Sequence, residues 1–255
     1  MNLQVLQNFL LRVRSTKVLA NFIVYLIDTG EIAVHHPGKK ITLVHSRSAL
    51  LSNLVLPIVP AATTAMHDKL VESGVQVIMN TRVTNTPALS GGESYLHTPD
   101  TTQYLLSNGD SVSADLYIDC TGTTRRSGNL VPAAHLDEHN FVKVQPDLQV
   151  EGMPGVFCIG DANNMHETKL AVFAEQHARV VVRNIHSLHN NRPTTVYAPL
   201  TWPVMAVPIG PYKGAGAIGS TVIGDFSVSW LLGRGLMVSK VGAGSDWKYQ
   251  SWSST

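Results

Sequence analysis

The sequence predicts an α/β protein in which strands and helices alternate and a small α/β domain follows at the C-terminal end. Three observations support this fold class. Two apolar, β-branched runs typical of buried strands, 41–45 and 75–79, flank a helical stretch at 60–73. A long helical pattern begins near Leu170. Beyond Arg192 proline becomes frequent and short β-type runs appear, which indicates a change of architecture.

Composition limits the classes of function. Of the 255 residues, 44% are hydrophobic and 15% are charged, so the chain can bury a sizeable core. The net charge is +1 and the basic residues are spread out, which argues against nucleic acid as a partner. Cys120 and Cys158 lie in apolar runs and form no Cys-x-x-Cys pair. A reducing compartment is therefore expected, namely the cytoplasm, with the mitochondrion as the alternative.

The first 28 residues form an atypical N-terminal segment, with basic residues but no acid before Asp28 and an apolar run at 18–27. This run is shorter than the roughly 20 residues that a helix needs to cross a bilayer. No small-x-small cleavage site precedes Asp28, so a targeting sequence stays open beside a replaced start with ordinary buried structure. Because no glycine-looped strand is recognisable here, we expect the sheet that follows to lack its first strand.

The stretch from 31 to 122 predicts a helix end, followed later by a hairpin. Glu31-Ile-Ala-Val-His35 has the pattern of the last turns of a helix, which Pro37-Gly38 would close. Asn108-Gly109 predicts a type I′ hairpin turn, because these two residues accept positive φ. The β-type runs around that turn are 95–97, 103–106, 112–114 and 116–120.

The most informative stretch is Gly155-Val-Phe-Cys-Ile-Gly160-Asp161, an apolar run that predicts a strand ending in Gly-Asp. Glycine at a strand end lets a ligand approach the backbone, and the Asp161 carboxylate can accept a hydrogen bond from a ribityl hydroxyl. The helix that follows would offer N–H groups and a positive dipole end to a flavin ring, with Thr168 as N-cap and Lys169 in the first turn. An ordinary strand, turn and helix explains these residues equally well. The apolar stripe of this helix is predicted at Leu170, Phe173, Ala174, Val181, Ile185 and Leu188.

These motifs together resemble the pyridine nucleotide-disulfide oxidoreductase-type flavoproteins, in particular the apoptosis-inducing-factor-like NAD(P)H:quinone reductases. The resemblance implies incomplete FAD/NAD(P)-binding Rossmann-like domains with a small C-terminal α/β domain, and FAD and NAD(P)H as cofactors. It places Gly160 and Asp161 on the FAD ribityl chain and Thr168 and Lys169 beside the isoalloxazine ring. The motifs that carry it are Thr121-Gly122, which would line the nicotinamide side, 155–161, Thr168-Lys-Leu-Ala171 and Gln176-His-Ala178.

The departures from that family matter as much. Its fold opens with Gly-x-Gly-x-x-Gly for FAD and repeats this motif for NAD(P)H, and neither copy is recognisable; Gly30-Glu31 resembles the tail of the helix after the second copy. The first half of the enzyme is therefore expected to be missing, which puts autonomous cofactor binding in doubt. Ser46 and Arg47 follow a strand where NAD-specific folds often place an acid. Arg47 could accept the 2′-phosphate of NADPH, or it is a solvated surface residue.

Two other motifs match known patterns only in their letters. Gly214-Ala-Gly-Ala-Ile-Gly219 has the spacing of a phosphate loop but precedes strand-like residues, so it is not expected to open a helix. His135-Leu-Asp-Glu-His139 has the order of an inverted zinc-protease motif, but Pro132 and a predicted strand near 141–144 leave little room for the helix it needs. A surface loop is the better interpretation of this motif.

The sequence thus predicts an FAD-dependent oxidoreductase fragment in which a hydride passes from NAD(P)H to FAD and on to a small acceptor such as a quinone. The alternatives are an inactive remnant that acts by binding a partner and, resting only on the His135 motif, a zinc hydrolase. Peripheral contact with a membrane and the oligomeric state stay open. The predicted divisions are an atypical segment at 1–28, a partial NAD(P)H-binding domain at 29–125, the returning part of the FAD-binding domain at 126–195 and a C-terminal domain at 196–255.

Overall fold

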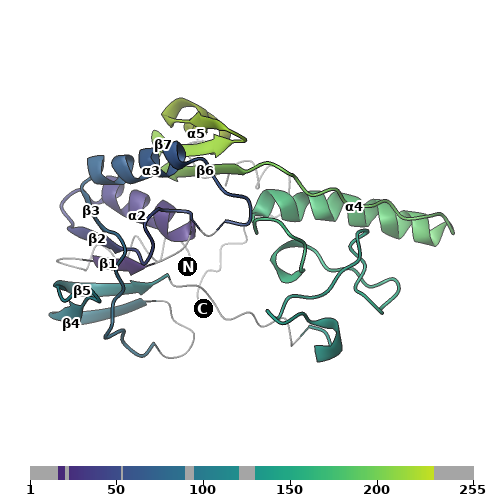
Figure 1. Ribbon diagram of the computed structural model, residues 1–255, viewed down its shortest axis with the longest axis horizontal. Helices are drawn as coiled ribbons and strands as arrows, with labels where there is room; N and C mark the ends of the chain where they lie inside the picture. Colours follow the sequence, from purple (N-terminus) through teal and green to yellow (C-terminus); the bar gives the residue numbers. More distant parts are fainter. Residues whose placement is uncertain (1–16, 21–22, 53, 90–94, 121–129, 233–255) are drawn as a thin grey trace, which may run out of the picture. The chain divides into compact units, whose positions relative to one another are not determined.

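The computed structural model, drawn in Figure 1, describes residues 17–20, 23–52, 54–89, 95–120 and 130–232. The chain divides into two compact units. The first unit consists of 1–52, 58–122 and 203–255, and the second of 53–57 and 123–202.

A five-stranded sheet with the order β3-β2-β1-β5-β4 forms the centre of the first unit. β1 pairs in parallel with both β2 and β5, and β2 with β3, whereas β4 is antiparallel to β5. The expectation that this sheet lacks its first strand is therefore wrong: the N-terminal segment supplies β1, whose backbone finds hydrogen-bonding partners on both sides. The strands are β1 (Lys17–Ala20), β2 (Ile41–Val44), β3 (Val75–Ile78), β4 (Tyr95–Leu105) and β5 (Ser111–Asp119).

Two helices, α2 (Ile23–His35) and α3 (Pro60–Glu72), pack against this sheet. The helix tail predicted at 31–35 is the end of α2. Pro60 occupies the first turn of α3, and Gly74, with φ +84, follows the helix in the left-handed region that favours glycine. Their buried side chains include Leu26, Ile32, Met66 and Leu70.

The β4–β5 hairpin confirms the predicted turn position but not its type. Gly109 has φ +91, whereas Asn108 is not among the residues with positive φ, so the turn is not type I′. The N–H of Gly109 donates to the Leu106 carbonyl and the N–H of Leu106 donates to the Asp110 carbonyl. A longer loop of this kind needs only one left-handed residue, and glycine supplies it.

A second sheet, β6-β7-β8, covers the outer side of α2 and α3, and the short helix α5 packs against this sheet (Figure 1). Its contact with α2 is close, since a Cβ on Gly30 would lie 2.8 Å from the Ile209 Cα. The C-terminal strands therefore belong to the first unit and not to a separate one, because the sheet buries its inner face on these helices. The assignment of the four predicted ranges to cofactor domains remains a prediction. The elements are β6 (Val204–Ile209), β7 (Lys213–Ile218), β8 (Thr221–Ile223) and α5 (Asp225–Leu232).

The structure agrees with the predictions for the glycine motif at 214–219 and the histidine motif at 135–139. Gly214–Ile218 lies inside β7 and pairs with strands on both sides, so this motif opens no helix. His135 ends the three-residue helix η2 (Ala133–His135), and the residues up to His139 form no helix. Among the helices of the described ranges, none is both long and apolar enough to cross a bilayer.

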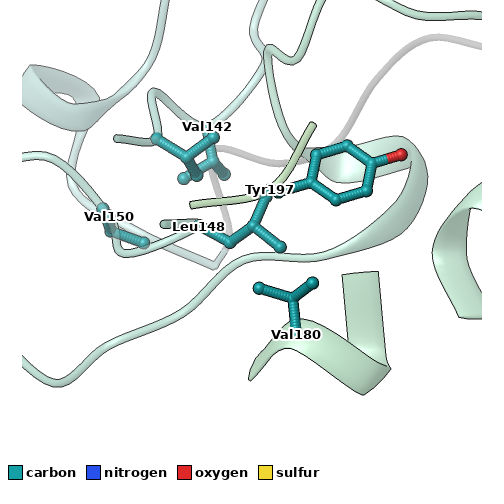
Figure 2. Packing of buried hydrophobic residues seen from close by; sticks show 6 residues of the cluster. Val142, Leu148, Val150, Val180 and Tyr197 are labelled. Carbon is teal, nitrogen blue, oxygen red and sulfur yellow. The ribbon is translucent and has the colours of Figure 1, made fainter. Parts of the chain in front are cut away.

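The second unit is built around the long helix α4 (Ala171–His189) and loops held by single β-bridges. The strands predicted at 141–144 and 155–159 are reduced to such bridges, for example between Gln149 and Phe157, because no neighbouring strand among the described residues pairs along their length. Figure 2 shows the apolar core of this unit, in which the ring of Tyr197 lies at one side of the aliphatic side chains. Its buried members are Val142, Val144, Leu148, Val150, Val180 and Tyr197.

The buried face of α4 differs from the predicted stripe. Phe173 is buried as expected, but Ile185 is 53% exposed. The buried residues of the helix are Phe173, His177, Val180 and Asn184, so two polar side chains occupy the core face. A stripe of apolar residues cannot include His177 and Asn184, and the two polar side chains shift the buried face toward Val180.

Asn184 connects α4 to two chain segments, and its replacement by leucine should be costly. Its amide donates to the carbonyls of Asp147 and Thr195 at 3.0 and 2.9 Å, and its Oδ1 accepts from the Thr195 N–H at 2.7 Å. We expect Asn184→Leu to lower the free energy of unfolding by about 2–4 kcal/mol in urea denaturation, because the buried backbone groups of Asp147 and Thr195 lose their partner. Arg183→Ala, on the exposed side of α4, is the control and should change the free energy of unfolding by less than about 0.5 kcal/mol. Equal effects of the two substitutions would contradict this role of Asn184.

Candidate functional site

The Gly160-Asp161 turn lies in a short 3-10 helix, η3 (Gly160–Ala162), of the second unit. Gly160 has φ +66, and its N–H donates to His177 Nδ1 at 3.0 Å. The Asp161 side chain is exposed, and the described part of the chain gives its carboxylate no hydrogen bond or ion pair. The predicted parallel strand before the turn is absent here. The turn is held by the His177 contact and by a single β-bridge, in which the Val142 N–H donates to the Ala162 carbonyl at 2.8 Å.

Asn163 anchors the loop that follows the turn. It is fully buried; its Nδ2 donates to the Cys158 carbonyl at 3.2 Å, and its Oδ1 accepts from the Met165 N–H at 3.1 Å and from Lys169 Nζ at 3.2 Å. Lys169 Nζ also donates to the Met165 carbonyl at 2.8 Å and lies 5.3 Å from the centre of the Phe141 ring. The ammonium group of Lys169 therefore joins the end of this loop to its beginning.

The start of α4 differs from the sequence prediction. The helix begins at Ala171 with Leu170 as its N-cap residue, so Thr168 is not the N-cap and Lys169 precedes the first turn. Because Lys169 is held by Asn163 and the Met165 carbonyl, residues up to 170 belong to the loop and not to the helix. Cys158 lies at the base of this loop; burial raises the pKa of its thiol, although Lys169 acts in the opposite direction.

A buried polar network lies beneath the turn. His177 Nε2 is 2.7 Å from Glu167 Oε1, in a close contact whose ring N–H is not aligned as a hydrogen bond, and the Tyr197 hydroxyl donates to Glu167 Oε2 at 2.8 Å. The His177 and Tyr197 rings meet edge to face, with centroids 4.4 Å apart. Burial lowers the pKa of His177 despite the opposing effect of Glu167, and it raises the pKa of Tyr197, to which the hydrogen bond to Glu167 contributes.

The sequence pattern does not predict this network. His177 belongs to the motif Gln176-His-Ala178, whereas Asn163, Glu167 and Tyr197 belong to none of the motifs. One signal was available: His177 follows Phe173 by four residues and therefore lies on the buried face of the helix. A polar residue at that position requires buried partners.

The other predicted site residues lie in the first unit. Ser46 and Arg47 follow β2, and the exposed Arg47 uses its carbonyl to accept from the Asn80 N–H at 3.1 Å. His45 at the end of β2 is buried with Nε2 3.1 Å from the Ala49 carbonyl, and burial lowers its pKa. Thr121 and Gly122 lie outside the described residues.

Comparison with known proteins decides the family. Residues 27–178 match the family described as pyridine nucleotide-disulphide oxidoreductase. The chain belongs to this family. The recognition made from the motifs is confirmed: the protein is an apoptosis-inducing-factor-like pyridine nucleotide-disulphide oxidoreductase with Rossmann-like α/β architecture.

Two similar proteins and one solved structure illustrate the match. Ferroptosis suppressor protein 1 of Mus musculus is 30% identical over 86% of this chain and 56% of its own length. Apoptosis-inducing factor homolog B of Dictyostelium discoideum is 26% identical over 79% of this chain and 54% of its own length. The ferredoxin reductase for the CYP199A2 system from Rhodopseudomonas palustris has a TM-score of 0.65 at 17% identity, covering 86% of this chain and 50% of that one. This chain thus spans about half the length of the relatives it matches.

The cofactors of the pyridine nucleotide-disulphide oxidoreductases, FAD and NAD(P)H, are those predicted from the motifs. The Gly160-Asp161 turn fits the ribityl chain of FAD, because an exposed carboxylate without a partner in the described chain can accept from a hydroxyl. Lys169 fits a direct flavin contact less well, since Asn163 and the Met165 carbonyl already hold its ammonium group. The roles of the individual site residues remain predictions.

Proposed function

We propose that this chain contributes the ribityl-binding and nicotinamide-side residues of an FAD-dependent oxidoreductase that passes a hydride from NAD(P)H to FAD and on to an acceptor such as a quinone. The exposed carboxylate of Asp161 on a glycine turn is the observation that carries the proposal. FAD, when bound, takes up the hydride and supplies two electrons to the acceptor. The chain itself has to bind and orient the two cofactors.

Each predicted residue has a role in that task. Asp161 accepts a hydrogen bond from a ribityl hydroxyl, and Gly160 lets the ligand approach the backbone. Thr168 and Lys169 belong to the loop beside the isoalloxazine, where Lys169 holds the loop in shape. Ser46 and Arg47 contact the ribose of NAD(P)H, with Arg47 accommodating a 2′-phosphate, and Thr121-Gly122 lines the nicotinamide side. The exposure of Arg47 after β2 supports this assignment.

Substitution of Asp161 tests the proposal. We expect Asp161→Ala to weaken FAD binding by about 10- to 100-fold, because one charged hydrogen bond is worth about 1.5–3 kcal/mol. Weak binding is measured by nuclear magnetic resonance titration of the labelled chain with FAD. Glu138→Ala removes another exposed carboxylate of the second unit, 85% exposed, and should leave the affinity unchanged. Equal FAD affinity in wild type and Asp161→Ala would refute the assignment.

A second candidate function is binding of another protein without catalysis. The outer side of α4 favours it, since Val182 and Ile185 are 67% and 53% exposed. Titration of the labelled chain with FAD separates the two candidates. Resonance shifts on adding FAD that are weaker in Asp161→Ala support the oxidoreductase, whereas a chain that does not respond to FAD supports the binding protein.

A further inference from the structure

We propose that His177 is a positioning residue, which fixes the Gly160-Asp161 turn through its Nδ1 atom, and that Glu167 and Tyr197 fix the tautomer and orientation of its ring. The inference rests on the proposed function. In that function, the network of His177, Glu167 and Tyr197 holds the Asp161 carboxylate where a ribityl hydroxyl can donate a hydrogen bond to it. The three side chains come from three segments, the loop before α4, α4 itself and the segment after it.

The hydrogen bond from Gly160 determines the tautomer of His177. The Gly160 N–H lies 3.0 Å from Nδ1 and can only donate, so Nδ1 presents a lone pair. The ring proton of the neutral imidazole is then on Nε2, which faces Glu167 Oε1 at 2.7 Å. The negative charge of Glu167 favours this tautomer even though the contact is not aligned as a hydrogen bond, because an unprotonated Nε2 would place its lone pair close to the carboxylate.

Tyr197 holds the carboxylate in turn. Its hydroxyl donates to Glu167 Oε2 at 2.8 Å, and its ring packs edge to face on His177. Figure 2 shows that the hydroxyl oxygen of Tyr197 lies at the end of the ring away from Val142 and Leu148. His177 and Glu167 are 1% and 2% exposed, so neither side chain can exchange its partner for water.

The turn needs such an external support. η3 has only three residues, and its closing hydrogen bond, from the Asn163 N–H to the Gly160 carbonyl, is long at 3.4 Å. No strand precedes it among the described residues, so sheet hydrogen bonds do not hold Gly160 either. The C-terminal end of the turn is held by the Val142 N–H, which donates to the Ala162 carbonyl at 2.8 Å. The contact with His177 Nδ1 is the hydrogen bond that holds the Gly160 N–H at its other end.

Acid should release this restraint. The ionisable groups that face the His177 ring are Glu167, which favours its protonation, Lys169, which opposes it, and Tyr197. Burial outweighs Glu167 and lowers the pKa of His177, so the ring is neutral at neutral pH. Protonation at lower pH places an N–H on Nδ1 against the Gly160 N–H. The contribution to stability is present above the ordinary histidine pKa and is lost as the pH falls below it toward the lowered pKa of His177.

The test is nuclear magnetic resonance of the full ¹⁵N-labelled chain. In the wild type we expect His177 to carry its proton on Nε2, and the Gly160 amide resonance to shift with the titration of His177. In His177→Phe and in Glu167→Leu, the Gly160 amide should exchange with solvent about tenfold faster, because about one net hydrogen bond is lost. His189→Phe replaces an exposed histidine of the same helix and should leave Gly160 unchanged.

A ring proton on Nδ1 in the wild type overturns the inference, even if both variants fail to fold. Unchanged Gly160 exchange in folded His177→Phe and Glu167→Leu overturns it as well. Titration with FAD separates this inference from the proposed function. If FAD binding weakens in Asp161→Ala but not in His177→Phe, the function stands and the positioning role falls. If Gly160 responds as expected but FAD binding is insensitive to Asp161→Ala, the positioning contact stands and the proposed function falls.

Discussion

Purified chain supplied with excess FAD and NADH is expected to show no steady oxidation of NADH with a soluble quinone. FAD and NAD(P)H each carry a pyrophosphate, which is usually bound by a tight glycine turn at a helix N-terminus. The one Gly-x-Gly-x-x-Gly match in this sequence, 214–219, lies in and just after β7. The Asp161 contact alone is worth about 1.5–3 kcal/mol, far below the roughly 8 kcal/mol of micromolar binding.

The experiment follows NADH absorbance at saturating FAD, with a full-length flavoprotein reductase of the family as the positive control. Steady turnover by the wild-type chain that disappears in Asp161→Ala would contradict the prediction, because it would mean that the chain forms a complete cofactor site. Turnover that persists in Asp161→Ala would point to free flavin in solution and not to the protein.

Gly216→Ala is expected to destabilise the first unit by about 3 kcal/mol, which is a large fraction of the stability of a small domain. A Cβ at position 216 would lie 2.0 Å from the Met205 carbonyl oxygen and 2.9 Å from the Ala206 Cα. Both atoms belong to the backbone of the paired strand β6, so the strands would have to move apart. The loss would extend to the packing of this sheet on α3. Urea denaturation of wild type and variant measures the difference.

Gly224→Ala is the matched control. A Cβ at Gly224 would meet no atom within 4 Å, and its φ lies outside the left-handed range. We expect its free energy of unfolding to stay within about 0.5 kcal/mol of the wild type, or to rise slightly because alanine restricts the unfolded chain. If Gly216→Ala proved as stable as Gly224→Ala, the close approach of β6 and β7 would not be the reason why glycine occupies position 216.

The sequence by itself determined the family and helix α3. The motif at 155–161 and the residues that follow it were sufficient to recognise a flavoprotein reductase, and the helix predicted at 60–73 agrees with α3. Helices can be predicted in this way because their hydrogen bonds join residues four apart, so the local pattern contains most of the information. The β-branched residues after 214–219 also predicted that this motif opens no helix, which agrees with β7.

Only the tertiary structure decided which apolar runs became strands and which polar residues became partners. Residues 17–20 form a central strand because β2 and β5 lie on either side, whereas 155–159 forms a single bridge for lack of a neighbour among the described residues. A strand depends on hydrogen bonds to segments far away in the sequence, which no local pattern contains. The contacts of His177 with Glu167 and Tyr197, separated by ten and twenty residues, arise in the same way when the loops fold onto α4.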